Sequence, residues 1–359
     1  MKRVLVTGGA GFVGASICVA LGADPACEVV ALDNLHRRGS ELNLDRLEVA
    51  GVEFIRGDVR DTKALNAIEP IDALIECSAE PSALVGMSGK TAYPFETNLV
   101  GAYNCLELAR RDGAQLIFLS TSRVYPYGAL SSLRLGETKT RFELADSQTL
   151  PGASPAGISE TFPLDGPRTL YGATKLAAEL LITEYAANFE LSTVIDRCGV
   201  IAGPWQMGRV DQGVFTFWLL HHHFDRPLTY LGYGGSGKQV RDLLHVDDLI
   251  ALIFEQLADP ERWRDFKGNV GGGRDCSLSL LEATELCRKL TGNQVEIATS
   301  DDRRPGDVPV YLSDCARLER LSEWRPSHSA AQILADTHAW VAAEHDRVAT
   351  SLGFEGAPR

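Results

Sequence analysis

The stretch "VTGGAGFVG", residues 6 to 14, decides the fold expected of this chain. It follows a short apolar run and opens a helical pattern, and its glycines at 8, 11 and 14 stand three residues apart. Gly8 allows a tight turn, Gly11 lets the backbone approach a pyrophosphate, and Gly14 lets helix and strand pack closely. The start of the helix then presents N–H groups to the phosphates. The spacing predicts a dinucleotide site, although a lone fingerprint of this kind also has a purely structural interpretation.

Two acidic residues strengthen this prediction. Asp33 ends the second predicted strand, 19 residues after Gly14, where a carboxylate can accept hydrogen bonds from a ribose diol and repel a 2′-phosphate. Asp58 ends the third strand, where an acid can bond an adenine amino group. Arg37 and Arg38 weaken the preference for NAD over NADP, because arginines there can pair with a 2′-phosphate. The combination predicts NAD as the cofactor.

Around the fingerprint, apolar strands alternate with helical patterns. Continuously apolar strands are typical of a parallel sheet that is covered on both faces. The predicted strands are residues 3–8, 28–33, 52–58, 72–77 and 115–122, and the clearest helix is 95–113, ended by Gly113. Strict alternation indicates an α/β fold with a Rossmann-type doubly wound parallel sheet.

The second half of the chain alternates less regularly. The polar stretch 126–167 is too long for an ordinary connection, so we expect a functional excursion or a partly ordered flap. Further predicted elements are a helix at 171–188, a strand at 191–197, an irregular region to about 240, and helices at 245–259 and 277–292, the last with Ser277 as N-cap. This pattern favours a smaller, discontinuous α/β domain for the substrate.

Composition excludes several partners. The net charge of −13 repels nucleic acid and anionic lipid, and no apolar run approaches the roughly 20 residues of a membrane span. Eight cysteines are scattered without close spacing, which indicates free thiols in a reducing cytoplasm. The histidines of "HHH", residues 221 to 223, point about 100° apart on a helix, so we expect no metal site there.

The stretch "RTLYGATK", residues 168 to 175, places Tyr171 and Lys175 on one face of a predicted helix. Thr121 ends the fifth strand, at the sheet edge where a bound dinucleotide presents its nicotinamide. An ammonium beside a phenol favours the phenolate, so Lys175 makes Tyr171 a usable base, while the Thr121 hydroxyl can hold the substrate oxygen. The alternative is a packed ring beside a solvated lysine, and the preceding fingerprint favours chemistry.

The motifs "TGGAGFVG", "GDVRD", "STSRVY" and "YGATK" resemble the extended short-chain dehydrogenase/reductase family, over residues 1 to about 340. The resemblance implies a catalytic Thr121, Tyr171 and Lys175. It implies an NAD-binding Rossmann domain formed by 1–197 plus about 237–266, and a nucleotide-sugar-binding domain formed by about 198–236 plus 267–345. The implied cofactor-binding residues are Gly8, Gly11, Phe12, Val13, Gly14, Asp33, Asn34, Arg37, Asp58, Val59, Ser78, Ala79, Glu80, Asn98, Tyr171 and Lys175.

The residues after Thr121 narrow the reaction. Ser122 and Arg123 stand where the family's sugar-nucleotide dehydratases carry an Asp-Glu pair, and where its decarboxylases usually keep the Glu. Epimerases and simple reductases remain. In an epimerase a sugar carbon gives a hydride to NAD⁺, the resulting ketone turns over, and the hydride returns to its other face. The resemblance therefore implies an NAD-dependent nucleotide-sugar epimerase; an NAD-sensing or scaffold protein on the same fold is the non-enzyme alternative.

The substrate half carries two segments of the same resemblance, "GSGKQVRDLLHVDDLI" (235–250) and "RRPGDVPVYLSD" (303–314). It places Arg241 and Arg304 on a diphosphate and Asp307 on the nucleoside ribose. Arginine forks suit a dianion in an acidic chain, and exposed surface arginines are the alternative. The substrate residues that the resemblance implies are Glu80, Ser122, Arg123, Val200, Asp211, Gln212, Gln239, Arg241, Arg304 and Asp307.

Three features are similar to the CDP-tyvelose (CDP-paratose) 2-epimerase group: "VDQGVF" (210–215), Gln239, and "ETKTRFELAD" (137–146) within the insertion. A UDP-hexose 4-epimerase is the alternative. Two departures leave the sugar open. "ECSAEPS" (76–82) replaces the usual His-Leu-Ala-Ala/Gly-Gln pattern, so that Glu80 either contacts the nicotinamide and sugar or faces solvent, and Val200 replaces a substrate-contacting Asn or Ser.

The resemblance also implies a homodimer. Members of the family commonly dimerise through a four-helix bundle, to which this chain would contribute its helices at 95–112 and 171–188.

Overall fold

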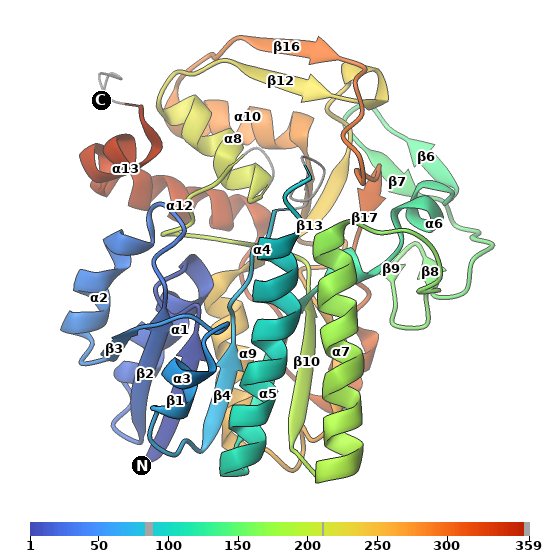
Figure 1. The fold of residues 1–359 in the computed structure, drawn as a ribbon. Coiled ribbons are helices and arrows are strands. Elements are labelled where there is room, and N and C mark those ends of the chain that lie inside the picture. Colours follow the sequence, from blue (N-terminus) through green and yellow to red (C-terminus); the bar gives the residue numbers. More distant parts are fainter. Residues whose placement is uncertain (83–88, 210–211, 355–359) are drawn as a thin grey trace. The chain divides into compact units, whose positions relative to one another are not determined.

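The computed structural model describes residues 1–82, 89–209 and 212–354 (Figure 1). The chain divides into two compact units, each described by itself below. Unit 1 comprises Met1–Val124, Leu170–Arg197 and Leu249–Lys267, and unit 2 comprises Tyr125–Thr169, Cys198–Asp248 and Gly268–Arg359. No helix formed by the described residues has the length and apolar character that crossing a membrane requires.

Unit 1 is built on a seven-stranded sheet in the order β14-β10-β5-β4-β1-β2-β3. Strand β1 pairs in parallel with β2 and β4, and the pairs β2–β3 and β4–β5 are also parallel. The order reverses at β1, which is the switch point of a doubly wound sheet and confirms the predicted fold class. The strands are β1 (Lys2–Thr7), β2 (Cys27–Asp33), β3 (Glu53–Arg56), β4 (Ala73–Glu76), β5 (Gln115–Thr121), β10 (Thr193–Cys198) and β14 (Phe266–Val270).

Helices cover both faces of this sheet. In Figure 1, α3, α5 and α7 lie in front of it, whereas α1 and α9 lie behind. Apolar side chains of α3, α5 and α7 share one buried cluster with those of the central strands. The helices are α1 (Phe12–Gly22), α2 (Leu44–Val49), α3 (Thr62–Asn66), α4 (Ala92–Phe95), α5 (Gly101–Asp112), α7 (Leu170–Phe189) and α9 (Val246–Ala258), with short turns η1 (Ser40–Asn43) and η3 (Ser122–Val124).

The helix predicted at 95–113 is longer and less regular than expected. It starts with α4, continues through a π-helical turn, η2 (Glu96–Val100), and ends with α5, where Gly113 adopts φ 64°. π-turns of this kind often occur at functional sites. This one contains Asn98.

Unit 2 has four small sheets and its own core. Strand β13 pairs with β11, β15 and β17, and β12 pairs with β16. Its strands are β11 (Val200–Ala202), β12 (Leu228–Leu231), β13 (Val240–His245), β15 (Ser277–Ser279), β16 (Ile297–Ser300) and β17 (Val310–Tyr311). Its helices are α6 (Tyr127–Ser131), α8 (Val214–His223), α10 (Leu280–Thr291), α11 (Ala316–Leu321), α12 (Ala330–Ala343) and α13 (His345–Leu352), with the short turn η4 (Tyr233–Gly235). Apolar side chains of α8, α10 and α12 form the core with β13.

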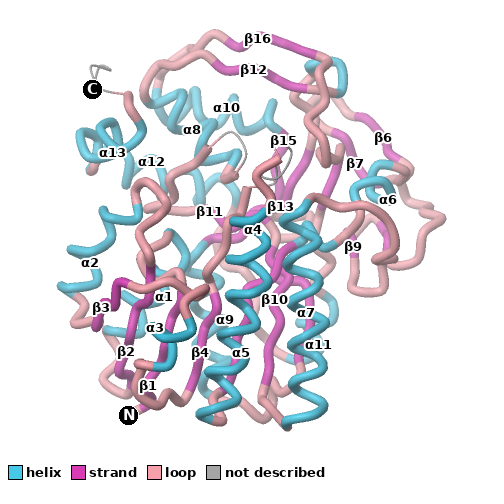
Figure 2. The backbone as a smooth tube through the Cα atoms, viewed as in Figure 1, coloured by secondary structure: helices cyan, strands magenta, loops and turns pink. Residues whose placement is uncertain are grey.

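The long insertion is ordered. Figure 2 shows strands within it in magenta, and it contains α6 and two hairpins, β6–β7 (Leu135–Glu137, Phe142–Leu144) and β8–β9 (Ala153–Ser154, Gly157–Ile158). Arg141 pairs with Glu282 of α10 at 2.9 Å, and the Ile158 N–H donates to the Leu312 carbonyl at 2.8 Å. These contacts group residues 125–169 with unit 2, whereas the sequence analysis assigned them to the first domain. What each unit binds stays a prediction.

Two local predictions in unit 2 are wrong. The region to about 240 is not irregular, because it contains α8, a helix in which an apolar run is followed by three histidines, so that no polar stripe marks it in the sequence. Ser277 is not the N-cap of α10, since it lies in β15. The cap is Ser279, which accepts the Glu282 N–H while the Glu282 carboxylate accepts the Ser279 N–H.

Candidate active site

The glycine-rich turn joins β1 to α1 in unit 1. Gly8 has φ +65°, and a Cβ on Gly14 would lie 2.2 Å from the Gly8 carbonyl oxygen, so only glycine allows this approach of helix to turn. Gly11 is the N-cap of α1, and no side chain caps that helix. Phe12 and Val13 form its first turn with Gly14. A cradle of backbone with uncapped helix N–H groups fits a pyrophosphate.

Asp33 lies at the end of β2, beside this turn. Its Oδ2 accepts the Ala10 N–H at 3.1 Å, and its Oδ1 accepts the Leu35 N–H at 2.7 Å. Burial raises the pKa of Asp33 above its ordinary value, although these backbone donors act to lower it. The carboxylate is therefore held at the edge of the turn, where the sequence places a ribose diol. Arg37 lies in the loop that follows.

Asp58 accepts hydrogen bonds from Arg60 and Asn34, two contacts that the sequence analysis did not predict. Arg60 donates to both of its oxygens, at 2.9 and 2.7 Å, and Asn34 Nδ2 donates at 2.8 Å. Arg60 holds the pKa of Asp58 well below its usual range. The Arg60 guanidinium also lies 4.8 Å from the Tyr93 ring centroid. The neighbouring Val59 is buried, and its carbonyl accepts the Asn104 amide.

The predicted catalytic residues all lie in unit 1. Thr121 ends β5, Tyr171 is the second residue of α7, and Lys175 follows one turn later. A Cβ on Gly172 would lie 2.1 Å from the Arg123 carbonyl oxygen, so the first turn of α7 packs directly on the segment after Thr121. Thr121 Oγ1 accepts the Arg123 N–H at 3.1 Å. Gly172 therefore allows the turn that carries Tyr171 to pack next to the end of β5. Ser122 lies in the same segment, as the first residue of η3.

Lys175 is buried and paired with an acid that the sequence analysis did not single out. Its Nζ lies 3.2 Å from Oε2 of Glu76, the last residue of β4, and both side chains are almost fully buried. The same Nζ lies 4.2 Å from the centroid of the Phe118 ring. The signal was present in the sequence, since Glu76 is the one acid in the apolar run "DALIEC" after Asp72. Its partner, however, is 99 residues away.

Asn98 connects the loop after β4 to α7. Its Oδ1 accepts the Glu80 N–H at 2.7 Å, and its Nδ2 donates to the Glu80 carbonyl at 3.1 Å and to Thr174 Oγ1 at 3.2 Å. The Glu80 carboxylate accepts the Ser82 N–H. Ser78 and Ala79 lie in the same loop. The amide therefore fixes the backbone of this loop beside the helix that carries Lys175.

A second buried acid anchors α7 one turn further on. Glu179 accepts the Ser120 hydroxyl at 2.6 Å and the Arg197 guanidinium through two nitrogens, Nε at 3.0 Å and Nη2 at 2.6 Å. Ser120 belongs to β5 and Arg197 to β10. These bonds tie α7 to two neighbouring strands.

In unit 2, two predicted substrate residues bind each other. Arg241 Nη2 donates to Asp307 Oδ1 at 2.7 Å and to the Val308 carbonyl at 2.6 Å. Gln239 is buried, and its Nε2 donates to the Leu231 carbonyl. The Arg304 carbonyl accepts the Asp307 N–H at 3.0 Å. The structure therefore brings the side chains of Arg241 and Asp307 into one cluster, and the backbone of Arg304 is bonded to the same turn.

Three further predicted substrate residues belong to unit 2: Val200, Asp211 and Gln212. Val200 lies in β11, which pairs with β13. The backbone of Gln212 pairs with Arg209. Asp211 lies outside the described residues. Whether these side chains contact a substrate stays a prediction.

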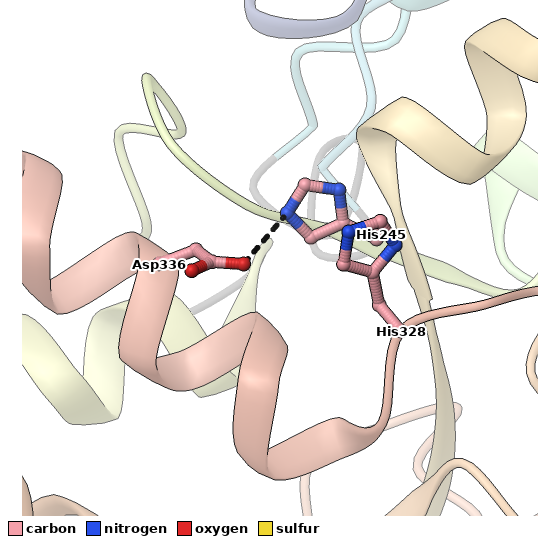
Figure 3. A group of neighbouring side chains, drawn as sticks. All are labelled: His245, His328 and Asp336. Carbon is pink, nitrogen blue, oxygen red and sulfur yellow. Dashed lines mark ion pairs between the residues drawn. The ribbon is translucent and has the colours of Figure 1, made fainter.

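Three side chains of unit 2 gather near the start of α9: His245, His328 and Asp336 (Figure 3). His245 Nδ1 accepts the Asp247 N–H at 3.0 Å, so its neutral ring carries the proton on Nε2, which faces Asp336 at 3.8 Å. A protonated nitrogen has no lone pair for a metal. We therefore interpret His245 as a cap of α9 with the His328 ring stacked on it, and not as part of a metal centre.

Comparison with known proteins identifies the family of this chain. Residues 4–270 match the family described as "NAD dependent epimerase/dehydratase family". The chain is 30% identical to the CDP-paratose 2-epimerase of Salmonella typhi over 94% of this chain and 98% of that protein. It is 28% identical to the UDP-glucose 4-epimerase of Erwinia amylovora, over 94% and 97%. It is also similar to the UDP-glucuronic acid 4-epimerase of Bacillus cereus solved with UDP-glucuronic acid and NAD, with a TM-score of 0.77, 25% identity, and 95% and 99% of the two chains covered.

Proposed function

The chain belongs to the NAD-dependent epimerase/dehydratase family, and from this premise we propose that it is an epimerase of a nucleotide-activated sugar, acting on a CDP-hexose at C2. The observation that carries the proposal is the buried Lys175 on the helix of Tyr171, whose first turn packs on the segment after Thr121. Membership in a family of enzymes leaves the alternative of an NAD-sensing or scaffold protein without support.

The residues present fit NAD. The glycine turn would hold the pyrophosphate on the uncapped start of α1, and Asp33 would accept the adenosine ribose hydroxyls. Lys175 would donate to the nicotinamide ribose. When bound, this cofactor accepts a hydride from a sugar carbon and returns it to the opposite face of the ketone.

The side chains then handle the proton. Tyr171, with the Lys175 ammonium beside it, would accept the proton of the hydroxyl on the reacting carbon, while the Thr121 hydroxyl holds that oxygen. After the ketone has turned over, Tyr171 returns the proton to the oxygen. No net oxidation results, because the hydride and the proton both return to the sugar.

The choice of epimerase rests on Ser122 and Arg123. Neither side chain can supply the acid and base that elimination of water requires, and their backbone is fixed against α7 and Thr121. A dehydratase is therefore disfavoured by the chemistry of these two positions.

The choice of a CDP-sugar rests on three features of the sequence, namely residues 210–215, Gln239 and residues 137–146. The last of these is supported by its position, since Phe142–Leu144 form β7 and Arg141 lies against α10 in unit 2, together with the Arg241 cluster. A UDP-hexose 4-epimerase is the second candidate, because the chain is almost as similar to UDP-sugar enzymes.

Product analysis tests the proposal. Purified protein is incubated with NAD⁺ and either CDP- or UDP-hexoses, and the products are identified by NMR. We expect inversion at C2 of a CDP-hexose; inversion at C4 of a UDP-hexose supports the second candidate, and no epimerisation of any candidate refutes the class. Tyr171→Phe should abolish turnover and leave NAD binding intact.

We also propose a homodimer formed by α5 and α7. These helices run side by side in Figure 1 and carry exposed apolar side chains, Tyr103 on α5 and Leu180 and Phe189 on α7. Arg110 of α5 lies over the Phe189 ring, so the two helices form one surface. Sedimentation equilibrium should give twice the chain mass, and Leu180→Lys should give the monomer mass.

A reducing cytoplasm is the proposed compartment. All eight cysteines are within the described residues, and each is a free thiol. Localisation of a tagged chain by cell fractionation tests this.

A further inference from the structure

Glu76 places a second charge beside the proposed catalytic lysine. We propose that Glu76 is a positioning residue for Lys175, whose buried carboxylate is the counterion that holds the ammonium beside Tyr171. The inference rests on the proposed function for its effect on turnover, but the pairing itself can be tested without cofactor or substrate.

The geometry is that of a closed ion pair. Lys175 reaches from α7 to the end of β4, where its Nζ meets Glu76 Oε2 at 3.2 Å, with 2% and 1% of the two side chains exposed. The ring of Phe118, from the neighbouring strand β5, lies 4.2 Å from the same nitrogen. Water therefore has little access to either charge, and the ammonium is held between a carboxylate and an aromatic face.

The charged and titratable groups around Lys175 come from three elements. Glu76 ends β4 and Cys77 follows it, and Tyr171 lies on α7 with Lys175. Cys105 lies on α5, where Glu76 acts to raise its pKa and Lys175 acts to lower it. Of these, Glu76 is the acid in direct contact. Lys175 therefore interacts with both the Glu76 carboxylate and the Tyr171 phenol.

Burial without a counterion favours a neutral amine. Burial acts to lower the pKa of Lys175, whereas the carboxylate of Glu76 and the phenol of Tyr171 raise it above its ordinary value. Without Glu76, Lys175 would lose its proton at a lower pH. An uncharged amine could neither favour the phenolate of Tyr171 nor make a charge-assisted hydrogen bond to the ribose.

A merely structural role is the alternative, and the chain provides a matched control. Glu179 is also a buried acid of this region that is paired with a cation, Arg197, and it lies one turn along α7 from Lys175. Glu179→Gln therefore removes a buried carboxylate from the same helix without removing the counterion of Lys175. Only the loss of Glu76 should change the titration of the lysine.

Lysine NMR tests the pairing directly. Protein labelled with ¹³C,¹⁵N-lysine is titrated without cofactor or substrate, and the ¹³Cε signal of Lys175 is assigned by its absence in Lys175→Met. In Glu76→Gln we expect the midpoint of Lys175 to fall by about 1 to 3 pH units relative to wild type, as for loss of a contacting charge. In Glu179→Gln the midpoint should equal that of wild type.

NAD affinity provides the functional measurement. The comparison uses Tyr171→Phe and the double variant Tyr171→Phe/Glu76→Gln, because the phenol of Tyr171 would otherwise titrate as well. At low pH the two proteins should bind NAD equally tightly. At alkaline pH the affinity of the double variant should fall about tenfold, whereas that of Tyr171→Phe should not change. If no sugar is epimerised, the proposed function fails, but the lysine titration still decides the role of Glu76.

Glu76→Met covers the case in which Glu76→Gln does not fold, because it replaces the carboxylate by an apolar side chain of similar length. The Lys175 midpoint should fall in this variant as well. An unchanged midpoint in Glu76→Gln, or in Glu76→Met if only that variant folds, overturns the proposal. A midpoint that falls equally in Glu179→Gln also overturns it, because the effect would then be that of any buried acid.

Discussion

Arg241 and Asp307 bind each other in unit 2, with 2.7 Å between Nη2 and Oδ1. Both residues are proposed to contact the nucleotide, one at the diphosphate and one at the ribose. A diphosphate that binds Arg241 would hydrogen-bond to the same guanidinium as Asp307. The Asp307 carboxylate would then fix the orientation of that guanidinium. If Arg241 binds the diphosphate as proposed, Asp307 would position the arginine before the substrate arrives.

Arg241→Ala should raise KM for the nucleotide-sugar about 10- to 100-fold, because hydrogen bonds to charged groups are worth about 1.5–3 kcal/mol. The value of kcat should change by less than about threefold, since a diphosphate contact binds ground state and transition state alike. Steady-state kinetics measures both. Arg288→Ala, which removes an arginine paired with Glu285 on α10, is the control, and an equal rise in KM there would contradict the prediction.

Asp33→Asn should reduce the preference for NAD over NADP by at least about tenfold, since the substitution removes a charge that repels a 2′-phosphate. Titration of each cofactor against tryptophan fluorescence gives the two affinities. Glu53→Gln, at the opposite end of β3 from the residue paired with Asp33, should leave their ratio unchanged. A ratio that stays constant in Asp33→Asn would remove this residue from the cofactor site.

Gly172→Ala should lower kcat about 100-fold while the chain stays folded, because the new Cβ would meet the Arg123 carbonyl at 2.1 Å and displace the first turn of α7. Turnover and far-UV circular dichroism are the measurements. Ala173→Ser changes the adjoining exposed position and should keep normal turnover. If Gly172→Ala also turns over normally, this contact does not position Tyr171.

Asp196 predicts a pH dependence of stability. Burial raises its pKa to about 7, although Gln256 lowers it, so the folded chain keeps a proton that the unfolded chain releases near pH 4. This contribution to the free energy of unfolding is full below about pH 4 and is lost as pH rises to about 7. Wild type should therefore lose about 2–4 kcal/mol relative to Asp196→Asn between these values.

Urea unfolding of wild type and Asp196→Asn at pH 4, 5.5 and 7.5 measures this difference. Asp275→Asn removes an exposed carboxylate and serves as the control. Parallel pH dependence of wild type and Asp196→Asn would show that Asp196 titrates normally.

The sequence predicted most strands of unit 1 because they are apolar runs followed by a helical period. It did not predict β14, whose sequence FKGNV contains a lysine, a glycine and an asparagine. It failed at α8, whose apolar residues form no stripe of helical period and are followed by three histidines. It also failed at Ser277, where the S-x-x-E spacing of Ser279 and Glu282 would have identified the cap. The glycine turn and the Tyr171–Lys175 spacing were readable because they are local. The pairing of Lys175 with Glu76, and of Asp58 with Arg60, depends on tertiary contacts or side-chain direction that a one-dimensional pattern does not contain.

Two buried acids, Glu76 at the end of β4 and Glu179 on α7, join α7 to the sheet, and this has a consequence for how a sugar could be inverted. Lys175 is joined to β4 through Glu76, and Glu179 to β5 and β10 through Ser120 and Arg197. A helix joined to three strands by side chains one turn apart can neither slide nor rotate without breaking buried charges. If the chain inverts a sugar as proposed, α7 would stay in place, and the ketone itself would have to turn about its linkage to the phosphate.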